Sequence, residues 1–185
     1  MPFVSKGKSV ITGKPTLSGA LALACVVGCS LAALADPPGD PKAVAEENGM
    51  WKDKNGDPTY KVDPDGTVDW YTYSGFRRYH SECHVCHGPD GEGSSYAPAL
   101  ANSLKTIGYA EFYGIVAGGR KNLGGGQEKV MPAFGDNKNV TCYLNDIYVY
   151  LRARSQEAIP RGRPLKHAAK PAAYADAEDK CMAGG

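Results

Sequence analysis

One run of five residues constrains the fold of this chain more than any other feature. Residues 83–87 read Cys-His-Val-Cys-His, so two thiols lie three positions apart and an imidazole follows the second thiol directly. A C-x-x-C-H run is the signature of covalent haem attachment. The thiols form thioether bonds to the haem, and the short turn carries the histidine to the iron. The run therefore predicts a fold built around one haem c, held by Cys83, Cys86 and His87.

Other chemistries also use a C-x-x-C pair, and they explain this sequence less well. A thioredoxin-type redox pair is expected beside a βαβ unit, and no such pattern surrounds Cys83. A zinc site with four cysteine ligands would normally contain a second C-x-x-C, and the chain has only one. A run that arose by chance would not come with the specific flanking residues described below.

The first 35 residues have the composition of a secretory signal. Three lysines are their only charges, and a strongly apolar stretch follows at 21–27. The segment ends in Ala33-Leu34-Ala35, a small-x-small sequence typical of a cleavage site. We therefore expect a signal peptide over 1–35, cleavage after Ala35, and export to the periplasm with no membrane span left after cleavage.

Two other fates of this leader stay open. The 21 uncharged residues after Lys14 are just long enough to cross a bilayer as an uncleaved anchor. Their content of Ala, Gly, Ser and Cys argues against that interpretation. The second alternative is lipidation at Cys29, because the preceding Val-Val-Gly loosely resembles a bacterial lipobox.

Cleavage after Ala35 changes the composition on which the function depends. The remaining 150 residues carry 18 basic and 20 acidic side chains, which gives a net charge of −2. Neither this balance nor the +1 of the whole chain suits a protein that binds nucleic acid through bulk positive charge. Four cysteines remain, and free thiols are unexpected in an oxidising compartment. Because Cys83 and Cys86 belong to the C-x-x-C-H run, we expect Cys142 to pair with Cys181.

Apolar spacing predicts three helices. One begins after Asp69, whose carboxylate suits a helix N-cap, and runs into the C-x-x-C-H turn. A second is expected over about 109–117 and a third over about 139–154. The third has an apolar face with the spacing i, i+3, i+4 and i+7. The residues of that face are Leu144, Ile147, Tyr148 and Leu151.

The segments on either side of these helices are expected to be extensions. Within 36–68, Asp63-Pro64-Asp65-Gly66 is a turn signal flanked by short β-prone runs, which predicts a small hairpin. The tail over 155–185 is rich in Pro, Ala, Lys and Arg and has few large apolar residues. We expect the Cys142–Cys181 bridge to hold this tail, because such a composition does not favour docking by burial alone.

Residues 69–154 contain an ordered set of motifs that resembles the class I c-type cytochromes. The motifs are Gly75-Phe76, His87-Gly88-Pro89-Asp90-Gly91-Glu92-Gly93, Ala97-Pro98-Ala99-Leu100 and Val130-Met131-Pro132-Ala133-Phe134. The resemblance implies a mostly α-helical fold, with helices around one covalent haem. It also implies that the last helix crosses the helix before the C-x-x-C-H run, where Gly75 permits close packing.

The same resemblance implies roles for three further residues. Met131, next to Pro132 in a loop, would be the sixth iron ligand; a methionine that fills a gap in the core is the alternative. The Pro98 carbonyl would accept a hydrogen bond from His87 and raise its basicity; a plain loop proline is the alternative. Arg120 would lie near a haem propionate, or it is an ordinary solvated arginine.

A histidine and a methionine together leave no open position on the iron, which favours an electron carrier over an enzyme. Residues 66–71 and 77–83 and the extra cysteine pair carry a narrower resemblance, to methanol-metabolism-related c-type cytochromes. It implies a PQQ-dependent methanol or alcohol dehydrogenase, of the lanthanide type, as electron donor. The implied acceptor is a downstream cytochrome c or terminal oxidase. The alternatives are a peroxidase-like haem enzyme or ligand sensor, and a cytochrome subunit fixed in a dehydrogenase complex.

Overall fold

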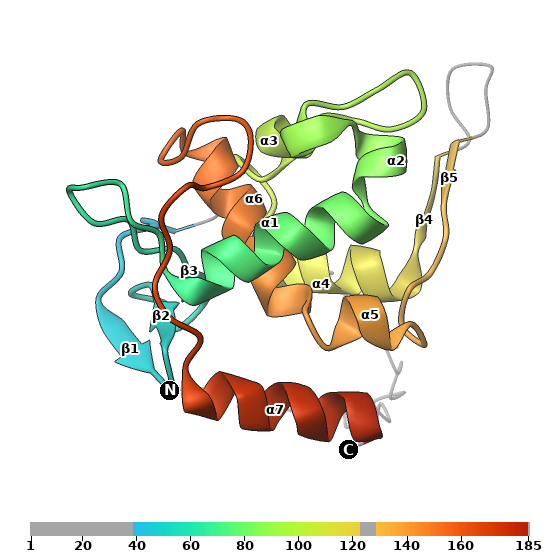
Figure 1. The fold of residues 1–185 in the computed structure, drawn as a ribbon. Helices are drawn as coiled ribbons and strands as arrows, with labels where there is room; N and C mark the ends of the chain where they lie inside the picture. Colours follow the sequence, from blue (N-terminus) through green and yellow to red (C-terminus); the bar gives the residue numbers. More distant parts are fainter. Residues whose placement is uncertain (1–38, 123–128, 185) are drawn as a thin grey trace, which may run out of the picture. The chain divides into compact units, whose positions relative to one another are not determined.

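Two helices that are far apart in the sequence cross at the centre of the described fold (Figure 1). They are α1 (Trp70–Glu82) and α6 (Leu144–Ser155). The crossing is close because Gly75 has no side chain: a Cβ there would lie 1.9 Å from the main-chain oxygen of Asp146. The packing expected at Gly75 is therefore confirmed, and this helix pair is the frame on which the site is built.

The computed structural model describes residues 39–122 and 129–184. The expected signal peptide at 1–35, its cleavage point and the lipidation candidate Cys29 lie outside the described residues. All of these described residues belong to one compact unit. Within the described ranges, no helix combines the length and the apolar character needed to cross a membrane.

The first helix begins where the sequence predicts. The Asp69 side chain accepts a hydrogen bond from the Thr72 N–H at 2.9 Å, which is the N-cap interaction. It also accepts one from the Lys61 N–H at 2.8 Å, so the cap fastens the preceding loop to the helix. Because α1 ends at Glu82, Cys83 follows directly at its C-terminus.

Further short helices surround this pair, and the mostly α-helical fold is confirmed. A 3₁₀ turn, Pro89–Gly91, follows the first of them. One of these helices agrees with the predicted 109–117 to within one residue. The helices are α2 (His84–His87), α3 (Leu100–Ser103), α4 (Tyr109–Gly118), α5 (Lys138–Thr141) and α7 (Ala172–Ala183).

The prediction of one continuous helix over 139–154 is wrong, because α5 and α6 are separated at Cys142 and Tyr143. Tyr143 leaves the helical conformation, with φ −124° and ψ 18°. At the break, Cys142 joins the disulfide and the Tyr143 ring is buried, 3.4 Å from the guanidinium carbon of Arg78. The apolar pattern does not reveal the break, because buried residues continue on both sides of it.

The extension before α1 contains a three-stranded antiparallel sheet. Its strands, in spatial order, are β1 (Ala45–Glu47), β2 (Met50–Lys52) and β3 (Pro58–Thr59). The hairpin predicted around 63–66 is present as an isolated bridge between Val62 and Val68. The sequence does not predict the larger sheet, because strands of two or three residues are too short to show an alternating pattern.

A two-stranded ribbon carries Met131. Its strands are β4 (Arg120–Asn122) and β5 (Lys129–Met131), which run antiparallel beyond the end of α4 (Figure 1). Arg120 lies directly opposite Met131 in this ribbon. Met131 therefore ends a strand, whereas the sequence places it in a loop. The expectation fails because the glycine-rich sequence before β5 has no strand pattern.

The C-terminal tail docks on the helix pair through its own helix, α7. The Tyr174 side chain is buried, and its hydroxyl lies 2.6 Å from Asp146 Oδ2 and 2.8 Å from Ser74 Oγ. The disulfide expected to hold the tail is present, and a buried contact that the sequence did not predict adds to it. The single buried ring of Tyr174, whose hydroxyl has hydrogen-bond partners on both sides, anchors α7. The average composition of a segment does not reveal the effect of one such residue.

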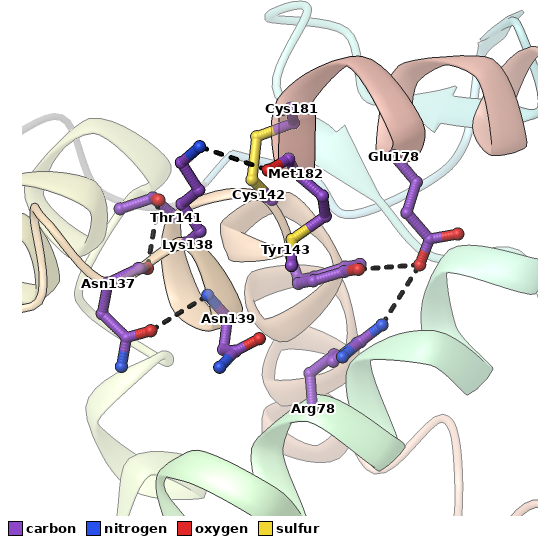
Figure 2. The surroundings of a disulfide bond; sticks show 10 residues. All are labelled: Arg78, Asn137, Lys138, Asn139, Thr141, Cys142, Tyr143, Glu178, Cys181 and Met182. Carbon is purple, nitrogen blue, oxygen red and sulfur yellow. Dashed lines mark hydrogen bonds and ion pairs between the residues drawn. A yellow bond between two sulfur atoms is a disulfide. The ribbon is translucent and has the colours of Figure 1, made fainter. Parts of the chain in front are cut away.

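The expected disulfide is confirmed, and it lies within a wider set of contacts to α7 (Figure 2). Cys142 and Cys181 are joined with a Cα–Cα distance of 5.7 Å. Glu178 accepts hydrogen bonds from the Tyr143 hydroxyl at 2.8 Å and from Arg78 at 3.1 Å. Both the covalent bond and the polar contacts therefore hold α7 against α1 and the start of α6.

Candidate haem site

A cavity of about 740 Å³ opens between α2, α4, the ribbon and one face of α6. Such a volume is within the range of sites that hold a cofactor. The sequence-predicted site residues all border this cavity, although they come from four separate parts of the chain. They are Cys83, Cys86, His87, Pro98, Arg120 and Met131.

Two free thiols stand on one side of the cavity. Cys83 directly follows the last residue of α1, and Cys86 lies in the next short helix, α2. They are not joined to each other, whereas the other two cysteines of the described residues form a disulfide. Burial raises the pKa of the Cys83 thiol to about 12, so this thiol is uncharged at neutral pH.

One ring nitrogen of His87 is held by the main chain of the loop that contains Pro98. Its Nδ1 lies 3.0 Å from the main-chain oxygen of Pro98. A carbonyl can only accept, so Nδ1 carries the proton and Nε2 keeps its lone pair for a metal ion. The hydrogen bond expected from His87 to Pro98 is therefore present in the structure, and His87 itself is buried.

The ribbon brings Met131 and Arg120 to the same cavity. Met131 is partly buried against the apolar core. The turn into β4 depends on Gly119, which has φ +74° and where a Cβ would lie 2.8 Å from the Met131 main-chain oxygen. Gly119 is a residue that the sequence analysis missed, because a glycine after a helix ordinarily reads as a simple helix stop.

These residues fit a covalently attached haem. Two thiols, an imidazole with a free Nε2 and a thioether border one cavity. Its remaining walls are largely apolar and come from α3, α4 and α6. The wall residues include Leu104, Phe112, Val116, Ile147 and Leu151.

Comparisons with known proteins agree with this geometry. No protein-family model matches the chain. It is 54% identical over 138 residues to cytochrome c-553I of Paracoccus denitrificans, across 75% of this chain and 61% of that protein's length. It is 40% identical over 96 residues to cytochrome c-555 of Methylococcus capsulatus, across 51% of this chain and 72% of that protein.

A solved structure gives the decisive match. The crystal structure of the c-type cytochrome XoxG from Methylobacterium extorquens AM1 superposes with a TM-score of 0.71 at 52% sequence identity. The match covers 80% of this chain and 98% of that one. The chain belongs to the c-type cytochromes. The resemblance inferred from the sequence motifs is thereby confirmed, together with the class I fold and the haem c.

A c-type cytochrome is an electron-transfer protein rather than an enzyme, so the preference for a carrier is confirmed as well. The structure of this cytochrome adds Lys129 and Tyr96 to the residues that the sequence points to around the haem cavity. Both line the cavity, together with Lys121, which follows Arg120 directly. Lys129 Nζ donates to the main-chain oxygen of Ser95 at 3.3 Å, which links the ribbon to the loop beside α3. The signal that could have found them is their position in the sequence: Tyr96 lies two residues before Pro98, and Lys129 lies two residues before Met131.

Proposed function

We propose that Cys83 and Cys86 hold the haem of this cytochrome as thioethers, and that His87 and Met131 are the two axial ligands of its iron. The hydrogen bond from His87 Nδ1 to the Pro98 carbonyl is the single observation that carries this proposal. It fixes the tautomer in which Nε2 can bind iron, and it increases the basicity of the ring. The bound haem supplies a one-electron Fe(III)/Fe(II) couple.

The residues of the chain around the haem would determine which reactions the Fe(III)/Fe(II) couple can take part in. His87 and Met131 border the cavity from α2 and the ribbon, and if both hold the iron, no coordination position would remain for peroxide or another substrate. Arg120, opposite Met131 in the ribbon and bordering the cavity, places a positive charge where it can pair with a haem propionate. The apolar walls exclude water, which limits reorganisation when the charge of the iron changes.

The proposed partner is a PQQ-dependent methanol dehydrogenase, of the lanthanide type, which would donate electrons one at a time. A downstream cytochrome c or terminal oxidase would accept them. The support comes from the 52% identity to XoxG and from the motifs at 66–71 and 77–83. The expected signal peptide, cleaved after Ala35, would place this exchange in the periplasm.

Stopped-flow mixing tests the donor. Oxidised cytochrome is mixed with a lanthanide-loaded PQQ methanol dehydrogenase, and reduction is followed through the visible absorption of the haem. We expect reduction only when both the dehydrogenase and methanol are present, with the dehydrogenase alone as control. Absence of reduction with methanol would rule out this donor and leave the role of electron carrier intact.

A further inference from the structure

The turn after His87 has an unusual backbone. Gly88, Asp90 and Gly91 have φ values of +71°, +58° and +77°, so three of four consecutive residues are in the left-handed region. Asp90 is the one residue of the three with a side chain, and L-residues with side chains rarely adopt that conformation. Such a turn is maintained only if contacts with the surrounding residues stabilise it. We call residues 88–93 the proximal turn, because they follow His87 directly.

Two buried tyrosines from the crossing helices fasten this turn. Tyr79 of α1 is fully buried, and its hydroxyl donates to the main-chain oxygen of Gly88 at 2.6 Å. Tyr150 of α6 donates to Asp90 Oδ1 at 3.2 Å. The two rings lie 5.6 Å apart. Each helix therefore holds one point of the proximal turn.

The segment between α6 and α7, residues 156–171, supplies a third attachment. We call this segment the C-terminal strap. The Gly162 N–H donates to Asp90 Oδ1 at 3.1 Å, and Arg161 Nε lies 3.6 Å from Asp90 Oδ2. Further along, the strap is fixed to the start of α1, where the Val68 N–H donates to the Lys166 carbonyl at 3.1 Å. The Asp90 carboxylate is therefore where the strap meets the proximal turn.

Asp90 is ionised in this environment. Burial alone would raise the pKa of its carboxyl, but the hydrogen bonds from Gly162 and Tyr150 and the nearby His80 and Arg154 hold that pKa below its ordinary value. His80 Nε2 lies 3.5 Å from Asp90 Oδ1, and Arg154 Nε donates to the Asp90 main-chain oxygen at 3.3 Å. A buried negative charge therefore lies three residues from His87.

We infer that Asp90 is a positioning residue through which the C-terminal strap fixes the proximal turn and lowers the reduction potential of the haem iron. The inference rests on the proposed ligation by His87. The turn closes back on that residue, because the Gly93 N–H donates to the His87 carbonyl at 2.7 Å. Movement of the turn would disturb the bond between His87 and Pro98. The negative charge of Asp90 also favours Fe(III), so both effects act in the same direction.

Two substitutions at Asp90 separate charge from attachment. Asparagine tolerates the left-handed conformation and keeps an acceptor for Tyr150 and Gly162, so Asp90→Asn removes the charge and its ionic contacts with Arg161 and His80 but keeps these two hydrogen bonds. Asp90→Gly keeps the backbone conformation and removes both charge and attachment. We expect the midpoint potential, measured by redox titration, to rise in both variants and to rise further in Asp90→Gly. Tyr150→Phe removes one donor from the carboxylate and is expected to raise the potential by the smallest amount.

Controls test whether a change in potential is specific. Tyr174→Phe weakens the attachment of α7 away from the proximal turn, and Asp176→Asn removes an exposed charge from α7. Both should leave the potential at its original value. If Asp90→Gly or Tyr150→Phe loses thermal stability while its potential does not change, Asp90 is only a structural residue and the inference fails.

Two other results would count against different parts of the argument. If Asp176→Asn raises the potential as much as Asp90→Asn, a general effect of net charge explains the change and the inference also fails. If the unmodified protein shows no spectroscopic sign of His87 and Met131 on the iron, the proposed ligation fails instead. The visible spectrum of the unmodified protein therefore distinguishes the two failures.

Discussion

At the scale of single residues, the proposed ligand Met131 would control whether the iron can react with small molecules. Met131→Ala removes the sulfur and keeps the backbone pairing between Arg120 and position 131. We expect the variant to lose the weak far-red absorption band that reports a Met–iron bond, to bind cyanide rapidly, and to have a lower reduction potential. Met182→Ala, at an exposed methionine in α7, is the matched control and should keep the band. A band that persists in Met131→Ala would mean that another residue is the ligand.

Asp146 gives a prediction about pH. Burial raises the pKa of its carboxyl to about 7, although hydroxyl groups from Ser74 and Tyr174 oppose the shift. In the unfolded chain the pKa is near its ordinary value of 3.8. Between those two values the folded protein binds a proton that the unfolded protein does not. The contribution of this group to stability is therefore largest below about pH 4 and declines as the pH rises to about 7.

Asp146→Asn should remove that decline, because the amide still accepts from Tyr174 and does not titrate. We expect the free energy of unfolding of the variant to exceed that of the unmodified protein at pH 8, by on the order of 2 kcal/mol. The difference should narrow or reverse at pH 4. Urea unfolding at both pH values measures it, with Asp179→Asn, an exposed carboxylate in α7, as control. Parallel pH profiles for Asp146→Asn and the unmodified protein would contradict the shifted pKa.

At the scale of elements, two helical glycines give opposite predictions for the same substitution. A Cβ at Gly75 meets the α6 backbone at 1.9 Å, whereas a Cβ at Gly114 in α4 meets nothing within 4 Å. Gly75→Ala should therefore lower the free energy of unfolding by about 3 kcal/mol, since α1 and α6 must separate. Gly114→Ala should raise it by about 0.5–1 kcal/mol, because alanine loses less entropy in a helix. Thermal unfolding of both variants tests these two predictions. A Gly75→Ala protein as stable as the unmodified protein would contradict the close crossing of α1 and α6.

The same elements show which structural features can be predicted from the sequence and which cannot. Helix α1, its Asp69 cap and the closely packed Gly75 follow from local spacing and side-chain chemistry, which a sequence displays directly. The left-handed conformation of Asp90 and the buried Arg152, which donates to the Gly39 carbonyl at 2.6 Å, do not follow. Each depends on a partner tens of residues away, and no local pattern reports such a partner. For the site, the sequence predicted which residues meet, and it missed Gly119, whose role depends on the path of the ribbon.

At the scale of the whole described unit, three outer segments attach to α6 by polar contacts. The sheet region reaches it through Asp53, 3.6 Å from Arg152, and the strap through Asp90 and Tyr150. Helix α7 reaches it through Tyr174 and Asp146. Each attachment ends on a buried side chain, Arg152, Asp90 or Asp146, so the extensions are parts of one folded unit rather than loose additions to a haem domain. Local loss of one attachment should therefore leave the other two in place.

The disulfide is the test of that independence. Replacing both Cys142 and Cys181 by serine frees a loop of 39 residues in the unfolded chain, which the chain-entropy relation values at about 4 kcal/mol as an upper bound. We expect a lower urea midpoint for the double variant. We also expect an unchanged visible spectrum and reduction potential, because the strap keeps its own bonds to Val68 and Asp90. If the reduction potential changes together with the urea midpoint, α7 and the strap are coupled, and the disulfide helps to hold the proximal turn in place.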